Sequence, residues 1–413
     1  MLKYITPRIR FQEFDFWWET IKLTDLGISV GGTAIESEFD PDGKYKVISI
    51  GSYSEESKYK DQGIRAIYSK KTEKRILEKD DLTMILNDKT STGKIIGRVL
   101  LIDEDNSYVY NQRTQRICLD KNKYVPDFIF QLLNADINRN KIVRSAQGNT
   151  QIYVNWSDIS NLDYLIPDSF DEQSAIGSLF RTLDDLLVSY KDNLTNYQSL
   201  KATMLSKMFP KAGQTVPEIR LDGFEGEWKF RKLDEIVNIV GGGTPDTNIK
   251  EYWNGEINWF SPTEVGNSIY LDTSEKRISE LGLQKSSAKI LPANRTILFT
   301  SRAGIGSVGI ITKDSATNQG FQSLVIKEGI DIYFLFSYSS EITRYAIKHS
   351  AGSTFLEISG RELGKMDIII PSYEEQSAIG SYFSNLDNLI AAHQEKISQL
   401  ETLKKKLLQD MFI

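Results

Sequence analysis

The sequence is poor in the residues that build disulfide frameworks and metal sites. It contains one cysteine, Cys118, and two histidines, His349 and His393, among 413 residues. A single thiol cannot form an intrachain disulfide, and one cysteine with two histidines does not supply the four ligands of a structural zinc site. Hydrophobic residues make up 40% of the chain. We therefore expect a fold held together by apolar cores.

Long apolar runs and catalytic signatures are also missing. No run approaches about 18 apolar residues, and the residues after Met1 show no secretion-like apolar stretch, so we expect a cytoplasmic protein without membrane contact. The segment Ser91–Lys94 lacks the upstream glycine and the following hydroxyl residue of a Walker loop. The sequence has no Pro-Pro pair, hence no Asn/Asp-Pro-Pro-aromatic tetrapeptide that could grip a flipped base, and no clear Asp…Glu-x-Lys nuclease trio. We expect that the chain is not itself an enzyme.

The charge distribution is more informative than the net charge. The formal net charge of −6 opposes binding to nucleic acid when taken alone. The segment from Lys58 to Arg98, however, contains 11 Lys/Arg and 6 Asp/Glu, and the segment from Glu275 to Lys313 contains 7 Lys/Arg and 2 Asp/Glu. Both windows carry +5 and lie at comparable places in the two halves. They are candidate DNA-facing surfaces, with solvated basic loops as the alternative.

One block of sequence occurs twice. Residues Glu172–Ser178 read Glu-Gln-Ser-Ala-Ile-Gly-Ser, and the same seven residues return at Glu375–Ser381, 203 positions later. Gly-rich and Asn-Gln segments also occur in both halves, at 31–33 and 241–244 and at 111–112 and 318–319. A repeat near half of the chain length indicates two copies of one structural plan. We expect two similar globular domains of mixed α/β structure.

A helical pattern follows each copy of the block. Apolar residues recur at steps of three and four for more than four heptads, beginning with Ile176, Phe180, Leu183 and Leu187 and with Ile379, Phe383, Leu386 and Ile390. This spacing predicts two helices of about 38 residues that pair along their length. Each helix carries a lysine at the same late position, Lys201 and Lys404, where a polar residue can fix the register.

The connections predict how these helices pair. The second domain starts soon after the first helix and stops just before the second, so short linkers suffice only if the helices are antiparallel. We expect two domains separated by two long antiparallel coiled-coil helices with pseudo-two-fold symmetry. The expected boundaries are 1–168, 169–213, 214–371 and 372–413, for the first domain, the central helix, the second domain and the C-terminal helix. Within the domains we expect strands at 45–50, 83–86, 95–102 and 295–300, and helices at 124–134 and 330–349.

The segment Thr300–Gly306 is the best candidate for reading bases. Its small residues permit close approach, and Arg302 can engage guanine with two hydrogen bonds. Its expected counterpart, Asn87–Gly97, keeps the Ile-Gly pair but differs in polar groups; two diverged surface loops are the alternative. The loop Gly241–Pro245 is either a tight turn or a cradle for a phosphate. The DNA-binding candidates are Lys58, Lys60, Arg65, Lys89, Thr90, Lys94, Arg113 and Arg116 in the first half, and Gly243, Thr244, Lys276, Arg277, Thr300, Ser301, Arg302 and Gln319 in the second.

Over its whole length the sequence resembles the specificity subunit of type I restriction–modification systems. The residues that carry the resemblance are Ile166-Pro167, Glu172-Gln173, Ile176 and Leu183-Asp184, repeated as Ile370-Pro371, Glu375-Gln376, Ile379 and Leu386-Asp387, together with Gly242–Pro245, Thr300–Arg302, Asn318-Gln319 and Gly352–Thr354. The first half departs from the pattern in two places. Ala34 replaces the proline after Gly-Gly-Thr, and Asn87-Asp88-Lys89 stands where Thr-Ser-Arg is expected.

The resemblance implies two target recognition domains, each reading one half of a bipartite, asymmetric site in double-stranded DNA. It implies that the helices set the spacer and dock two methyltransferase subunits, with restriction/translocase subunits joining through the complex. S-adenosylmethionine, ATP and Mg would then belong to those partners, and this chain would bind no cofactor and no metal. The helix residues implied in partner binding are Glu172, Gln173, Ile176, Phe180, Glu375, Gln376, Ile379 and Phe383.

Three other interpretations stay open at this point. The chain could be a coiled-coil adaptor with two protein- or ligand-binding domains, in which case it would not be retained on DNA in a salt-dependent way. A free-standing enzyme fused to recognition domains is disfavoured by the missing catalytic motifs. A recognition cassette without cognate partners would keep the fold and lose the assembly.

Overall fold

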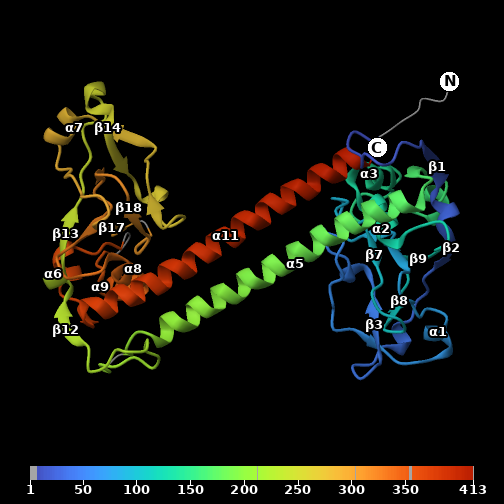
Figure 1. The fold of residues 1–413 in the computed structure, drawn as a ribbon, viewed down its shortest axis with the longest axis horizontal. Coiled ribbons are helices and arrows are strands. Elements are labelled where there is room, and N and C mark those ends of the chain that lie inside the picture. The colour runs from blue at the N-terminus through green and yellow to red at the C-terminus, as the bar shows by residue number, and fades with distance from the viewer. Residues whose placement is uncertain (1–6, 212, 303, 353–355, 413) are drawn as a thin grey trace. The chain divides into compact units, whose positions relative to one another are not determined.

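The structure is a computed structural model that describes residues 7–211, 213–302, 304–352 and 356–412. The chain forms two compact units. Unit 1 comprises Met1–Lys191 with Glu395–Ile413, and unit 2 comprises Asp192–Gln394. Each unit contains both helices and β-sheets, as Figure 1 shows, so the predicted mixed α/β class is confirmed. Within the described residues, no helix is long and apolar enough to cross a bilayer.

Unit 1 is built on a four-stranded antiparallel sheet of order β2-β9-β5-β7 and a three-stranded sheet of order β4-β3-β8. The strands are β2 (Gly27–Gly31), β9 (Thr114–Leu119), β5 (Leu82–Ile85), β7 (Val99–Leu101), β4 (Arg65–Ala66), β3 (Tyr45–Ile48) and β8 (Tyr108–Tyr110). Two further antiparallel pairs join β1 (Trp18–Lys22) to β11 (Asp163–Pro167) and β6 (Asn87–Asp88) to β10 (Ile152–Tyr153). The short helices are α1 (Lys70–Glu73), α2 (Pro126–Asn134), α3 (Asp136–Arg144) and α4 (Trp156–Ile159).

Unit 2 repeats this plan. Its sheets have the orders β13-β20-β17-β18-β15 and β16-β14-β19, and β12 pairs with β21. The strands are β12 (Lys229–Lys232), β13 (Val237–Gly241), β14 (Trp253–Phe260), β15 (Tyr270–Leu271), β16 (Lys276–Ile278), β17 (Thr296–Phe299), β18 (Val308–Ile311), β19 (Ser315–Thr317), β20 (Gln322–Ile326) and β21 (Asp367–Ile370). The short helices are α6 (Leu233–Ile236), α7 (Glu280–Gln284), α8 (Ile332–Ser337), α9 (Ser339–His349) and α10 (Gly360–Gly364).

Matching strand orders confirm the duplication that the repeated block predicted. The first four strands of the larger sheet of unit 2 correspond in order to β2-β9-β5-β7, and β16-β14-β19 corresponds to β4-β3-β8. Even the mixed pairing is repeated, because β3 is parallel to β8 and β14 is parallel to β19. The strands β5 and β17 are buried at every residue, as expected for central strands.

Most elements expected inside the domains are present, and two differ. Strands β3, β5 and β17 and helix α2 lie within or across the expected ranges. The segment expected as a strand at 95–102 is a strand only over Val99–Leu101, because Gly97 adopts φ +74° in the preceding turn. The helix expected at 330–349 is divided into α8 and α9 at Tyr338, whose ring packs against Phe209.

Two long helices, α5 (Phe170–Lys207, 38 residues) and α11 (Tyr373–Met411, 39 residues), each contribute one part to either unit (Figure 1). Within unit 1, α5 contacts α11 through Asp184–Lys404 and Lys191–Glu401. Within unit 2, it does so through Tyr197–His393 and Lys201–Asp387. In both units the partner number falls as the α5 number rises, so the local pairing is antiparallel.

Candidate nucleic-acid interface

Two glycines bring neighbouring loops into close contact, one in each unit. A Cβ atom on Gly32 would lie 2.0 Å from the carbonyl oxygen of Asn111, and a Cβ atom on Gly242 would lie 2.0 Å from that of Asn318. Only glycine permits this approach of two backbones. The backbone N–H of Gly243 donates to the Thr317 carbonyl at 2.8 Å. That donor is therefore used within the protein, which favours the tight-turn interpretation of the loop; a phosphate contact of the loop stays a prediction.

A third loop joins each of these contacts. In unit 1 the N–H of Leu86 donates to the Arg113 carbonyl at 2.9 Å, and in unit 2 the N–H of Ser301 donates to the Gly320 carbonyl at 2.8 Å. Residues 31–36, 86–90 and 111–113 therefore meet in unit 1, and residues 241–245, 300–302 and 318–320 meet in unit 2. We call each set a loop junction. Both junctions carry exposed polar side chains.

The strand register corrects one expected correspondence between the halves. Ile85 pairs with Thr114 in unit 1, and Thr300 pairs with Phe321 in unit 2. When the two Asn-Gln segments are superposed, Thr114 corresponds to Phe321 and Ile85 therefore corresponds to Thr300. The residue of unit 1 that stands in the place of Arg302 is then Asn87, not Lys89 as expected from the sequence.

In unit 1 the loop junction holds a carboxylate in a fixed position. The Glu36 Oε1 atom accepts hydrogen bonds from Asn111 Nδ2 at 2.9 Å and from Gln112 Nε2 at 3.0 Å. The Asn111 hydrogen bond is the main cause that lowers the pKa of Glu36 below its ordinary value. Arg113 is exposed beside it and has φ +71°. The sequence search missed Glu36, because an exposed glutamate four residues after a Gly-Gly pair carries no local signal.

In unit 2 the loop junction carries hydroxyl, amide and guanidinium groups. Thr244 Oγ1 donates to Gln319 Oε1 at 2.5 Å, and both side chains are exposed. Arg302 is half-buried. Thr300 is buried and shapes its own loop, since its hydroxyl donates to the Gly304 carbonyl at 2.6 Å and accepts from the Ser307 N–H at 2.8 Å. Ser301 is 0% exposed. The prediction that Thr300 and Ser301 contact DNA is therefore wrong, because neither side chain reaches the surface.

The basic candidates of the first half do not form one uniform face. Arg65 Nη1 and Nη2 donate to both carboxylate oxygens of Asp61 at 3.0 and 2.9 Å, which lowers the pKa of Asp61 to about 2. Lys94 pairs with Glu55 at 2.9 Å. Lys58 lines a hollow that is also lined by α2, α5 and α11 residues and by no residue of the loop junction. Counting charges along the sequence could not reveal these pairings. Glu55 lies outside the counted window 58–98, and Asp61 lies inside it, but a count does not show that Asp61 pairs with Arg65.

Four further exposed candidates, Lys89, Thr90, Lys276 and Arg277, lie in or next to the junctions. Asp88 Oδ1 accepts from the N–H and from the hydroxyl of Thr90 at 2.9 Å each, which fixes the turn that presents Lys89 and Thr90. Lys276 and Arg277 lie on β16, opposite Trp259 and Asn258 of β14. The Trp259 Nε1 atom donates to the Gly243 carbonyl at 2.9 Å, which places β16 next to the unit 2 junction. Lys60 is exposed as well, on the loop that follows Ser52.

Arg116 is partly buried in unit 1, where it pairs with a buried carboxylate. Its Nη2 atom lies 2.7 Å from Asp81 Oδ2, and the Asp81 side chain is 3% exposed. Burial raises the pKa of Asp81 above its ordinary value. This ion pair gives Arg116 a structural role, and its contact with DNA stays a prediction.

We expect Arg116→Ala to lower the free energy of unfolding by about 2 kcal/mol, because a charged hydrogen bond in a partly buried site is lost. Urea unfolding followed by circular dichroism measures the effect. The exposed Lys89→Ala variant is the control and should change stability by less than about 0.5 kcal/mol. Equal stability of the two variants would contradict the buried role of Arg116.

The helix residues expected to bind partners are buried inside their own units. Glu172 accepts from Arg10 Nε and Nη2 at 2.6 Å each and from Trp18 Nε1 at 3.2 Å. Glu375 repeats this arrangement with Arg220 at 2.8 and 2.7 Å and with Trp228 at 3.3 Å. The prediction of partner contact is therefore corrected for the residues that are 0–2% exposed, namely Glu172, Gln173, Ile176, Phe180, Glu375, Gln376, Ile379 and Phe383.

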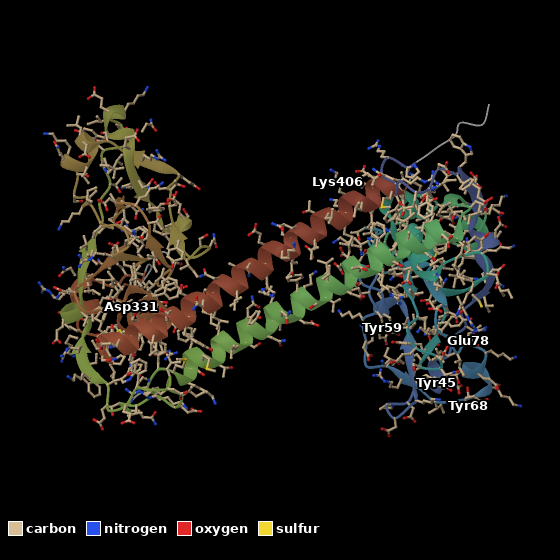
Figure 2. All side chains as sticks on the ribbon, viewed as in Figure 1. Tyr45, Tyr59, Tyr68, Glu78, Asp331 and Lys406 are labelled. Carbon is tan, nitrogen blue, oxygen red and sulfur yellow. The ribbon has the colours of Figure 1, made fainter. Side chains whose placement is uncertain are left out.

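These residues attach each long helix to a globular body. The Gln376 Oε1 atom accepts from the backbone N–H of Asp331 at 3.1 Å, and Figure 2 labels Asp331 beside the first turns of α11. Gln173 makes the equivalent bond to Val125 N at 3.1 Å. The sequence did contain a signal for the ion pairs, since an arginine and a tryptophan eight positions apart occur in both halves, at 10 and 18 and at 220 and 228.

Comparison with known proteins agrees with this duplicated architecture. The family model of the type I restriction modification DNA specificity domain matches residues 17–197 and 225–402. The MjaIX type I restriction enzyme specificity subunit of Methanocaldococcus jannaschii is 38% identical over 192 residues, which are 45% of this chain and 44% of that protein. The EcoR124I/EcoR124II specificity subunit of Escherichia coli is 30% identical over 190 residues, which are 44% and 46% of the two chains. The matched region thus spans less than half of either relative.

A solved structure has a similar fold over the full length. The crystal structure of the type I restriction–modification system S subunit from M. genitalium superposes with a TM-score of 0.66 at 17% identity, covering 99% of both chains. At this identity the likeness concerns the fold alone.

Proposed function

This chain belongs to the type I restriction modification DNA specificity family, and we propose that it is the DNA-reading subunit of such a system. Each unit reads one half of a bipartite, asymmetric site in double-stranded DNA through its loop junction. The observation that carries the proposal is that both junctions share one frame and differ in the groups they present. The frame is the contact of Gly32 with Asn111 and of Gly242 with Asn318.

The groups presented by the two junctions favour different bases. Unit 1 offers the Glu36 carboxylate, the Gln112 amide and the Arg113 guanidinium, and unit 2 offers Thr244, Gln319 and Arg302. A carboxylate accepts from the amino group of cytosine, amides pair with adenine, and arginine pairs with guanine. One frame with two sets of groups suits the reading of two unlike half-sites.

The same proposal covers the partners. Two methyltransferase subunits dock on the chain, and restriction/translocase subunits join through that complex. S-adenosylmethionine, ATP and Mg are bound by those subunits, and the assembly works in the cytoplasm, where its DNA is. Outward-facing leucines on the long helices support two equivalent docking sites, because they are 39–45% exposed and repeat at the offset of 203: Leu186 with Leu389, and Leu200 with Leu403.

The long helices act as the spacer between half-sites. A helix of 38 residues extends about 57 Å at 1.5 Å per residue. That length corresponds to an upper limit of about 17 base pairs at 3.4 Å each. The number of unread base pairs then follows from helix length and not from contacts with DNA.

Methylation mapping tests the proposed function. The chain is expressed together with its methyltransferase subunits, and N6-methyladenine is located by long-read sequencing. We expect one bipartite motif with a fixed spacer that disappears when this chain is omitted. Methylation that does not depend on the chain, or that follows an undivided motif, would overturn the proposal.

Arg302→Ala is expected to weaken recognition of one half-site only. Loss of an arginine that engages guanine with two hydrogen bonds costs about 1–3 kcal/mol. Methylation should then spread to sites altered in the half-site read by unit 2, while the other half-site stays unchanged. Arg302→Lys keeps the charge without the paired donors and should show the same relaxed motif. Lys289→Ala removes an exposed cation of the same unit and should leave the motif intact.

A further inference from the structure

We infer that two crossed aspartate–lysine pairs fix the single register in which α5 and α11 pair. The pairs are Asp184 with Lys404 in unit 1 and Asp387 with Lys201 in unit 2. They are positioning residues, and their effect on the spacing of half-sites rests on the proposed function.

The pair in unit 1 links three elements. The Lys404 Nζ atom of α11 lies 2.5 Å from Asp184 Oδ1 of α5. The other carboxylate oxygen, Oδ2, accepts from Gln131 Nε2 of α2 at 2.9 Å. Gln131 is buried, and the side chains of Asp184 and Lys404 are 26% and 21% exposed. One carboxylate therefore joins the globular body, its own helix and the opposing helix.

The pair in unit 2 makes the same three-way link with the helices exchanged. The Lys201 Nζ atom of α5 lies 2.5 Å from Asp387 Oδ1 of α11. Asp387 Oδ2 accepts from the Tyr333 hydroxyl of α8 at 2.8 Å. Burial, together with this hydrogen bond to Asp387, raises the pKa of Tyr333 far above its ordinary value, so the hydroxyl stays a donor. Asp387 is 7% exposed.

Both pairs specify one register. The residue numbers of the partners add up to 588 in each pair, and the aspartates and the lysines are each separated by the repeat offset of 203. Apolar positions recur every three or four residues, so they tolerate a slip of one turn better than a point contact does. A slip of one turn moves a side chain by about 5.4 Å along the axis, which separates ammonium from carboxylate in both pairs.

The link to the globular bodies makes the register matter for DNA. Gln131 and Tyr333 bind the two aspartates to the globular part of each unit. If the opposing helix slips, its lysine moves while the aspartate stays in place, and the ion pair is broken. Polar contacts at single positions are the best-attested means of fixing register in paired helices. The spacing of half-sites would then be set by the four charged residues as well as by helix length.

Exchange of charges within one helix tests the inference without changing the net charge. The α5 exchange combines Asp184→Lys with Lys201→Asp, and the α11 exchange combines Asp387→Lys with Lys404→Asp. Either exchange alone places like charges at both crossings, and we expect the midpoint of thermal unfolding to fall by on the order of 5–15 °C. The combination of all four substitutions restores opposite charges and should recover most of that loss.

A surface pair on the same helices is the control. Lys191 and Glu401 form an ion pair at 2.6 Å, but their side chains are 48% and 52% exposed. Lys191→Glu alone should shift the midpoint by less than about 2 °C, because exposed pairs contribute little. If the fourfold variant is no more stable than either exchange alone, the pairs do not act through their charges and the inference is overturned.

The spacer provides the second readout. In the complex with methyltransferase subunits, either exchange alone should give several spacer lengths or lose methylation, and the fourfold variant should return the native spacer. A single native spacer in both exchange variants would overturn the inference while leaving the proposed function intact. If the native complex itself methylates no bipartite site but the thermal rescue occurs, the proposed function fails and the register role stands.

Discussion

Glu172→Ala and Glu375→Ala are expected to loosen the attachment of the long helices and to lower the free energy of unfolding by about 3–5 kcal/mol each. Each substitution removes a carboxylate that accepts hydrogen bonds from a guanidinium and from an indole N–H and that is itself 0–2% exposed. A buried charge that loses its partner costs more than the pair had contributed.

The two sites should not respond equally. The hydrogen bonds that the structure describes for the Arg10 guanidinium both end on Glu172. Arg220 also donates to the carbonyls of Gly226 at 2.6 Å and Glu225 at 3.0 Å, so its guanidinium keeps partners when Glu375 is removed. We therefore expect the larger loss for Glu172→Ala.

Urea unfolding followed by circular dichroism measures both losses. Asp171→Ala and Glu374→Ala are the matched controls, since each removes an exposed carboxylate from the same helix turn as the buried one. A carboxylate in the first turn of a helix contributes about 0.3–1 kcal/mol. If the buried and exposed substitutions cost the same, the ion pairs do not hold the helices in place.

Gly242→Ala is expected to abolish reading of the half-site that we assign to unit 2. The new Cβ would lie 2.0 Å from the Asn318 carbonyl oxygen and 2.3 Å from Thr317 Oγ1, so the loops of the junction must separate. Overpacking of this kind costs about 1–3 kcal/mol. The displaced loops carry Thr244 and Gln319, whose positions the proposed reading requires. Methylation mapping should show loss of the native motif in that half-site only.

The adjacent glycine is the control. A Cβ on Gly241 meets nothing nearer than Gln322 Oε1 at 3.8 Å, at the end of a flexible side chain. Gly241→Ala should therefore keep the motif. In unit 1, Gly32→Ala and Gly31→Ala form the equivalent pair, with closest approaches of 2.0 and 3.3 Å. Normal methylation by Gly242→Ala or Gly32→Ala would show that the junctions do not read DNA.

Part of the fold was visible in the sequence because it depends on local periodicity and on repetition. The heptad spacing from Ile176 and from Ile379 predicted both long helices, and runs of β-branched and apolar residues predicted β3, β5 and β17. Tyr338, which divides the helix expected at 330–349, has no such signal, since its ring contact with Phe209 brings together residues far apart in the chain.

The candidate site was predicted less well, because it depends on contacts between residues that are far apart in the chain. The Gly-Gly and Asn-Gln segments were found, because they recur in both halves. Whether Thr300, Ser301 and Arg116 are free to contact a ligand depends on pairing between distant strands. The structure buries Thr300 and Ser301 and pairs the partly buried Arg116 with Asp81. Glu36 is a candidate because Asn111 and Gln112 donate hydrogen bonds to its carboxylate, and the sequence alone does not show these contacts.

The sequence by itself determined that this protein is a duplicated pair of mixed α/β domains with two long, pairing helices, since a repeat and a heptad can be recognised along one dimension. Only the tertiary structure decided which side of the repeated Glu-Gln block is buried and which residue matches Arg302. The first depends on Arg10 and Trp18, which lie more than 150 positions from Glu172. The second depends on hydrogen-bond register between β-strands, and a shift of two residues there leaves no trace in the order of amino acids.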